Sequence, residues 1–101
     1  MIYQITVPAV ADDVEEIRVL EWHGAPGDSF ASGDLVVEFE THKALVEVRA
    51  GQPGVLRRIM ATAGDWARIG VPIALFSDGA DDALPEGDDA IGDMAVDFLV
   101  D

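Results

Sequence analysis

The chain has 101 residues, enough for one small domain or for a smaller domain followed by a tail. It carries 20 acidic and 6 basic residues, so its formal net charge is −14. This acidity argues against nonspecific binding to nucleic acid or to an anionic membrane, because both need clustered Lys and Arg. The lack of cysteine excludes disulfides and thiol chemistry. No apolar run approaches the roughly 20 residues that span a bilayer, so we expect a soluble, cytoplasmic protein.

Short strands separated by turns are predicted throughout residues 1–76. Alternating or β-branched apolar runs indicate strands at 2–7, 17–22, 35–40, 44–49, 55–60 and 72–76. No eleven-residue window in this part has a convincing helical period. The expected fold class is therefore all-β, a small sandwich or barrel. Five aromatic residues are expected in its core: Trp22, Phe30, Phe39, Trp66 and Phe76.

A sequence repeat with an offset of 37 residues divides this part into two halves. Residues 26–33 align with 63–70, and residues 35–39 align with 72–76. Each half reads as a strand, a Gly-Asp turn, a short strand, a glycine and another strand. Glycine suits turn positions with positive φ, and the Asp side chain can accept hydrogen bonds from nearby backbone N–H groups. Gly-Asp turns are common, so chance is the alternative, but the run of matches predicts a sandwich with pseudo-two-fold symmetry.

Acidic residues are concentrated in the last quarter of the chain. Residues 1–76 hold 11 acidic and 6 basic residues, whereas residues 77–101 hold 9 acidic residues and no basic one. The second part also contains Pro85 and three glycines, a composition typical of a solvated linker. We therefore place a domain boundary after residue 76 and expect an acidic tail that is mobile from Ser77 to Asp89.

The end of this tail, residues 90–100, has the character of a short docking segment. Five apolar residues have the spacing of one helical face: Ile91, Met94, Ala95, Phe98 and Leu99. Four also alternate as in a strand: Met94, Val96, Phe98 and Val100. Gly92 would weaken a helix by roughly 1 kcal/mol. A segment this short is marginal alone, so we expect it to be ordered only where it docks on the sandwich, on another copy of the chain or on a partner protein; a frayed linker end is the alternative.

The segment Glu40-Thr41-His42-Lys43-Ala44 links two predicted strands through very few residues, which indicates a tight hairpin with Lys43 at or near its tip. Lys43 is also the only lysine in the chain. A solvated turn lysine is the ordinary interpretation. However, an exposed amine without competitors, held on a rigid turn, meets the requirements for attaching a prosthetic group at one defined site.

With these motifs, residues 1–76 resemble the lipoyl domain of the acyltransferase component of 2-oxo acid dehydrogenase complexes. The resemblance covers about three quarters of the chain. It rests on Val7-Pro8, Glu21-Trp22, Pro26-Gly27-Asp28, Gly33-Asp34, the hairpin motif, Val46-Glu47-Val48, Gly54-Val55, Gly64-Asp65 and Gly70-Val71-Pro72. It implies a flattened barrel or sandwich of two four-stranded antiparallel sheets, with lipoic acid attached to Lys43 through an amide. It also implies recognition residues around the site: Glu40, Thr41, His42 and Ala44, with Gly27 and Gly54 on the adjoining surface.

The function implied by the resemblance is that of a carrier with no catalytic residues of its own. A lipoate ligase or lipoyl transferase would attach the group. A thiamine-dependent 2-oxo acid decarboxylase would then reductively acylate it, an acyltransferase core would remove the acyl group, and dihydrolipoyl dehydrogenase would reoxidise it. Such an arm keeps acyl groups and reducing equivalents at high effective concentration near successive active sites.

Two features bear on alternatives to this interpretation. The family usually has Asp where this chain has His42, which would alter recognition by the decarboxylase. Biotinyl domains share the fold and hairpin, but their lysine normally lies between two methionines rather than between His42 and Ala44. An unmodified binding or adaptor module is a third alternative. His23 and His42 come with no evident ligand cluster, so we expect no metal site.

Overall fold

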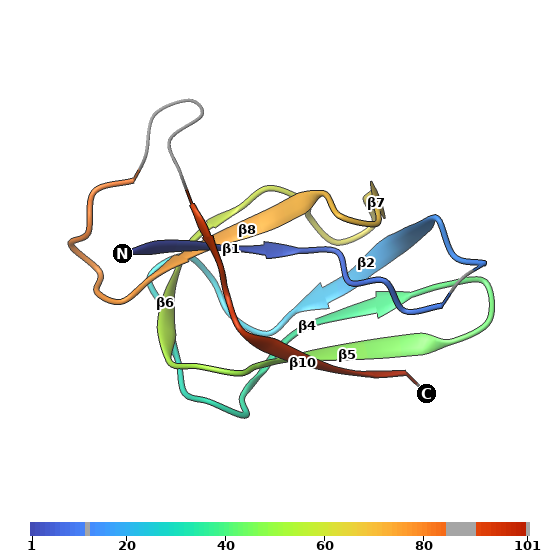
Figure 1. The fold of residues 1–101 in the computed structure, drawn as a ribbon, viewed down its shortest axis with the longest axis horizontal. Coiled ribbons are helices and arrows are strands. Elements are labelled where there is room, and N and C mark those ends of the chain that lie inside the picture. Colours follow the sequence, from blue (N-terminus) through green and yellow to red (C-terminus); the bar gives the residue numbers. More distant parts are fainter. Residues whose placement is uncertain (12, 85–90, 101) are drawn as a thin grey trace.

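The computed structural model describes residues 1–11, 13–84 and 91–100, and in these ranges the protein is all-β. Its ten strands are β1 (Ile2–Thr6), β2 (Glu16–Trp22), β3 (Ser29–Phe30), β4 (Leu35–Glu40), β5 (Leu45–Ala50), β6 (Gly54–Ile59), β7 (Trp66–Arg68), β8 (Pro72–Ser77), β9 (Gly92–Asp93) and β10 (Val96–Val100). They form two five-stranded sheets, in the orders β3-β6-β8-β1-β9 and β10-β5-β4-β2-β7 (Figure 1).

Strands β1 to β8 supply four strands to each sheet, and all of their pairings are antiparallel. The expected pair of four-stranded antiparallel sheets is therefore confirmed for this part of the chain. The tail extends each sheet by one strand. β9 joins the edge of β1 in parallel, and β10 joins the edge of β5 antiparallel.

Reciprocal hydrogen bonds relate the two halves of the repeat. The N–H of Gly27 donates to the carbonyl of Leu56 at 2.7 Å, and the N–H of Gly64 donates to that of Val19 at 2.7 Å. Leu56 and Val19 are themselves 37 residues apart. Within the described ranges, positive φ occurs at the matched glycine pairs: Gly27 and Gly64 (101° and 95°), Gly33 and Gly70 (95° and 88°). The predicted pseudo-two-fold symmetry is thus built into the turns.

The core lies between the two sheets and is formed by the inward residues of both halves. Its largest fully buried side chains are Phe39, Phe76, Ile5, Ile17, Leu56 and Ile73, with six valines around them. Phe30 packs edge-to-face on Phe76, with ring centroids 5.7 Å apart. Trp22 is partly buried and donates its indole N–H to the carbonyl of Ala61 at 2.7 Å.

Trp66 departs from the expected aromatic core, because 58% of it is exposed. It lies in β7, a three-residue edge strand in which Ala67 points inward and Trp66 and Arg68 point outward. A strand turns alternate residues to opposite faces, so burying Ala67 places the indole on the outer surface. The expectation that Trp66 belongs to the core is therefore wrong.

The beginning of the tail is attached to the sandwich. Ser77 closes β8 and is buried. The guanidinium of Arg57 donates to the carbonyls of Gly79 and Asp82, at 3.3 and 2.6 Å. The N-terminal ammonium lies 3.0 Å from a carboxylate oxygen of Asp82. Residues 77–84 therefore make several contacts with the sandwich, while residues 85–89 of the stretch expected to be mobile lie outside the described residues.

The docking segment is a strand and not a helix. Met94 is buried, and its N–H donates to the carbonyl of Gln4 at 2.8 Å. β10 then runs along β5, from Val96 opposite Ala50 to Val100 opposite Val46. The free edges of β1 and β5 offer unpaired backbone groups that an extended segment satisfies along its length. The strand-like alternation is therefore borne out and the helical spacing is not.

Candidate functional site

The lysine hairpin connects β4 to β5 through residues 41–44. Glu40 pairs with Leu45, and the N–H of Thr41 donates to the carbonyl of Ala44 at 2.8 Å, which closes a four-residue turn. The Thr41 hydroxyl oxygen accepts hydrogen bonds from the N–H groups of Lys43 and Ala44, at 3.1 and 3.0 Å. His42 and Lys43 are the two central residues and both are exposed. One threonine thus anchors a turn that presents the lysine to solvent.

The side chain of Lys43 is 63% exposed and has one charged partner among the described residues. Its ammonium donates to a carboxylate oxygen of Asp13, in the loop between β1 and β2. The hydrogen bond and the charge of Lys43 lower the pKa of the Asp13 carboxyl below its ordinary value of 3.8. Both groups are exposed, so the ion pair orients the amine without removing it from water.

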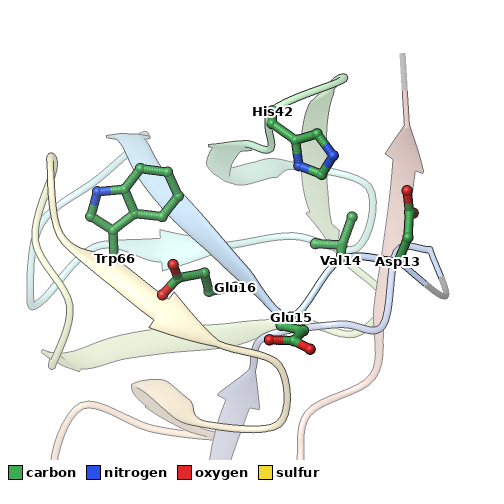
Figure 2. Close-up of a pocket in the computed structure, with 6 residues that line it drawn as sticks. All are labelled: Asp13, Val14, Glu15, Glu16, His42 and Trp66. Carbon is green, nitrogen blue, oxygen red and sulfur yellow. The ribbon is translucent and has the colours of Figure 1, made fainter.

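A hollow of about 330 Å³ lies beside the hairpin, under His42 (Figure 2). Its lining residues are Asp13, Val14, Glu15, Glu16, His42 and Trp66. Figure 2 shows His42 above Val14, with Asp13 on one side and the indole of Trp66 on the other. The surface next to the lysine is therefore acidic and includes one exposed aromatic ring. The sequence placed Trp66 in the core and gave no indication that Asp13 lies beside the lysine, so both were missed.

The other predicted site residues fall into two groups. Glu40 pairs with Arg18 of β2 across the sheet, at 3.2 Å, and with Thr41, His42 and Ala44 it adjoins Lys43 in sequence and space. Gly27 follows the end of β2 remote from the hairpin. Gly54 begins β6, which follows the end of β5 remote from the hairpin. The structure therefore does not bring Gly27 and Gly54 to the lysine. The resemblance had implied that both lie on the adjoining surface.

A separate cluster that sequence reasoning did not anticipate lies on the outer face of the β2–β4 pair. It contains Glu21, His23 and Glu38, whose potential ligand atoms all lie within 4.8 Å of one another. Its sequence signal is the i, i+2 spacing of Glu21 and His23 at the end of β2. Glu38 comes from the neighbouring strand β4, and its position depends on the pairing register.

No described helix is long and apolar enough to cross a membrane.

Comparison with known proteins agrees with this geometry. The Biotin_lipoyl family model, described as "Biotin-requiring enzyme", matches residues 3–76. The chain belongs to the biotin/lipoyl attachment-domain family. The match includes the hairpin and both halves of the repeat, and it leaves the last 25 residues outside.

Within the family, lipoyl domains of 2-oxo acid dehydrogenase complexes are well represented among the similar proteins. The succinyltransferase component of the 2-oxoglutarate dehydrogenase complex of Staphylococcus saprophyticus is 36% identical over 77 residues, which are 76% of this chain and 18% of the relative. The acetyltransferase component of the pyruvate dehydrogenase complex of Rhizobium meliloti is 34% identical over 79 residues, 77% of this chain and 18% of the relative. The chain therefore spans about a fifth of the length of these curated relatives.

A solved structure supports the same assignment. The lipoyl domain of the 2-oxoglutarate dehydrogenase complex from Azotobacter vinelandii superposes with a TM-score of 0.66 at 28% identity. The alignment covers 76% of this chain and 98% of that domain. The biotin/lipoyl domain described here is thus similar in fold and sequence to a lipoyl domain over almost the whole of the latter.

Proposed function

We propose that this biotin/lipoyl domain is a lipoyl carrier in which Lys43 holds lipoic acid through an amide on Nζ. The observation that supports this most directly is the position of the only lysine of the chain at the exposed tip of a turn anchored by Thr41. When bound, a lipoyl group supplies a dithiolane that takes up acyl groups and electrons. The protein contributes a fixed point of attachment, so one arm can serve successive active sites at high effective concentration.

The residues around Lys43 fit such an attachment. Nothing but Asp13 pairs with the amine in the described part of the chain, and the side chain is mostly exposed, so a modifying enzyme can reach it. Thr41 holds the backbone on both sides of the tip. Forming the amide removes the positive charge of Lys43, and the Asp13 carboxylate then loses its partner.

The partners are inferred from this role, and the chain spans about a fifth of the length of the curated relatives that it matches. A lipoate ligase or lipoyl transferase would modify Lys43. A thiamine-dependent 2-oxo acid decarboxylase, an acyltransferase core and dihydrolipoyl dehydrogenase would then use the arm in turn. Glu40, Thr41, His42 and Ala44 are the residues that these enzymes would meet first. We propose that the carrier functions in the cytoplasm and binds neither nucleic acid nor a membrane.

We propose that residues 1–76 form the carrier domain and residues 77–101 an acidic tail. The boundary is supported by the change in charge and by the end of the matched region. The pairing of β9 and β10 with the sheet edges supports a docking role for the apolar residues near the end of the tail.

A biotinyl carrier is the second candidate, because the matching family model also covers biotin-dependent proteins. The residues beside the lysine favour lipoate, since His42 and Ala44 stand where biotinyl domains normally have methionines. The purified chain should be incubated in parallel with lipoate ligase, lipoate and ATP, and with biotin ligase, biotin and ATP. We expect a single lipoyl increment by intact mass and no biotin increment. Biotin attachment alone, or no modification by either enzyme, would contradict the proposal, and the latter would favour an adaptor module.

The contribution of His42 to recognition is tested by the variant His42→Asp, which restores the residue usual in lipoyl domains. We expect unchanged lipoylation and a changed rate of reductive acylation by the decarboxylase, because the charge beside the arm changes. Ala44→Ser is a matched control that alters the other neighbour of the lysine without adding charge. Equal rates for wild type and His42→Asp with several decarboxylases would show that His42 is a neutral turn residue.

A further inference from the structure

We propose that Glu21, His23 and Glu38 form a binding site for one divalent transition-metal ion. Glu21 lies in β2 and His23 two residues further on, so their side chains project from the same face of the sheet. Glu38 is the direct partner of Glu21 in the neighbouring strand β4. The N–H of His23 donates to the carbonyl of Val36 at 2.9 Å, which continues the pairing beyond β2 and fixes the backbone of the histidine.

The potential ligand atoms are close to the spacing that such an ion requires. The Nε2 atom of His23 lies 2.6 Å from an oxygen of Glu38 and 3.8 Å from an oxygen of Glu21. Around a tetrahedral zinc ion with bonds of about 2.0–2.2 Å, neighbouring ligand atoms are about 3.3–3.6 Å apart. The two distances lie on either side of this spacing, so small side-chain rotations would adjust both.

The electrostatics of this face also favour a cation here. Glu21 and Glu38 are directly opposite each other, and like charges in such a pair destabilise a sheet. Two other acidic residues of this sheet have an arginine partner, Glu40 with Arg18 and Glu47 with Arg49. Within the described residues, the ion-pair partner of Glu21 and Glu38 is His23 alone. A bound divalent ion would neutralise the two carboxylates more completely than one imidazole does.

The donor set selects the class of ion. One imidazole nitrogen with two carboxylates suits Zn²⁺ and neighbouring first-row ions, whereas Mg²⁺ and Ca²⁺ prefer oxygen ligands alone. The side chains of Glu21, His23 and Glu38 are 67%, 29% and 28% exposed, so water can complete the coordination. The ion would link β2 to β4, and none of its three ligands belongs to the lysine turn at residues 41–44 or is Asp13.

The test is a titration of the unmodified 101-residue chain with zinc chloride, followed by calorimetry and by amide chemical shifts. We expect one saturable equivalent, with the largest shifts at the three ligands. His23→Gln and Glu38→Gln should each weaken binding by about tenfold or more. His42→Gln, which removes the other histidine, should leave binding unchanged, and magnesium chloride should not compete.

Several outcomes would overturn the proposal. These are zinc binding by His23→Gln or Glu38→Gln as tight as by wild type, shifts spread over the acidic surface without saturation, or loss of binding in His42→Gln. Each variant is checked for a wild-type-like dispersed amide spectrum, and Glu21→Gln provides a further ligand variant should one of the others fail to fold. A wild-type chain that shows no shift with zinc would exclude the site outright.

Discussion

The ammonium group of Lys43 is ion-paired with the carboxylate of Asp13, which lies 30 residues earlier in the chain. The pair joins the tip of the β4–β5 hairpin to the loop between β1 and β2. Amide formation on Lys43 abolishes the positive charge that maintains it. The environment of Asp13 therefore reports the modification state of the lysine.

We expect the pKa of Asp13 to be lower in the unmodified protein than in the lipoylated protein. Lys43 lowers this pKa in the folded state. The ion pair therefore stabilises the fold at pH values above 3.8, the ordinary pKa of the group, and this contribution is lost as the pH falls through the folded-state pKa. Carboxyl chemical shifts recorded against pH measure it. Asp82 is the matched control, because its pKa is lowered by the N-terminal ammonium and should not respond to lipoylation. Equal Asp13 values in both forms would contradict the ion pair.

Thr41 should stabilise the lysine turn. Thr41→Val keeps the size of the side chain but removes the oxygen that accepts hydrogen bonds from the N–H groups of Lys43 and Ala44. We expect a loss of roughly 1 kcal/mol in the free energy of unfolding, measured with urea, and slower lipoylation. Thr41→Ser retains the hydroxyl and should behave like wild type. If Thr41→Val were as stable and as well modified as wild type, the turn would not depend on this side chain.

The two matched glycines of the repeat should be equally sensitive to substitution. Gly27→Ala and Gly64→Ala each place a side chain at positive φ, which costs about 1–2 kcal/mol. Chemical denaturation of both variants should give losses within a few tenths of a kcal/mol of each other. Gly79→Ala is the control, since the nearest atom to its added Cβ is 4.0 Å away and its φ is not positive. A neutral Gly64→Ala beside a costly Gly27→Ala would contradict the symmetry.

Docking of the tail should depend on Met94, which lies between β9 and β10 and is only 5% exposed. Met94→Ala should weaken docking by roughly 2 kcal/mol and lower the protection of β10 amides against hydrogen exchange. Met60→Ala, at a site that is 43% exposed, should leave that protection unchanged. Undiminished protection in Met94→Ala would show that β10 is held by its pairing with β5 alone.

Local patterns in the sequence are sufficient to predict the sandwich, the symmetric turns and the lysine hairpin. Positive φ favours glycine strongly, so the matched glycines mark the positions of the turns. The alternation of apolar residues places β4 and β5 on either side of Lys43, and the few residues between them leave little choice but a tight turn.

Features that depend on tertiary neighbours could not be predicted in this way. The apolar residues of the tail fit both a helix and a strand, and the open edge of β5 decides between them. The side of β7 that faces the core determines the exposure of Trp66. Asp13, in the loop between β1 and β2, accepts a hydrogen bond from Lys43 in the hairpin between β4 and β5. The contact between Glu38 and His23 depends on the pairing register of two strands. None of these contacts leaves a local signature.

The measurement that tests lipoylation of Lys43 most directly is trypsin digestion after treatment with lipoate ligase and lipoate. Trypsin cleaves after unmodified Lys43, the only lysine, and yields the peptides 19–43 and 44–49. Lipoylation would block this cleavage and leave one peptide, 19–49, carrying a single lipoyl increment, while Lys43→Arg would gain no increment and keep its fold. Complete cleavage after Lys43 in the treated protein, or a lipoyl increment on Lys43→Arg, would contradict the assignment.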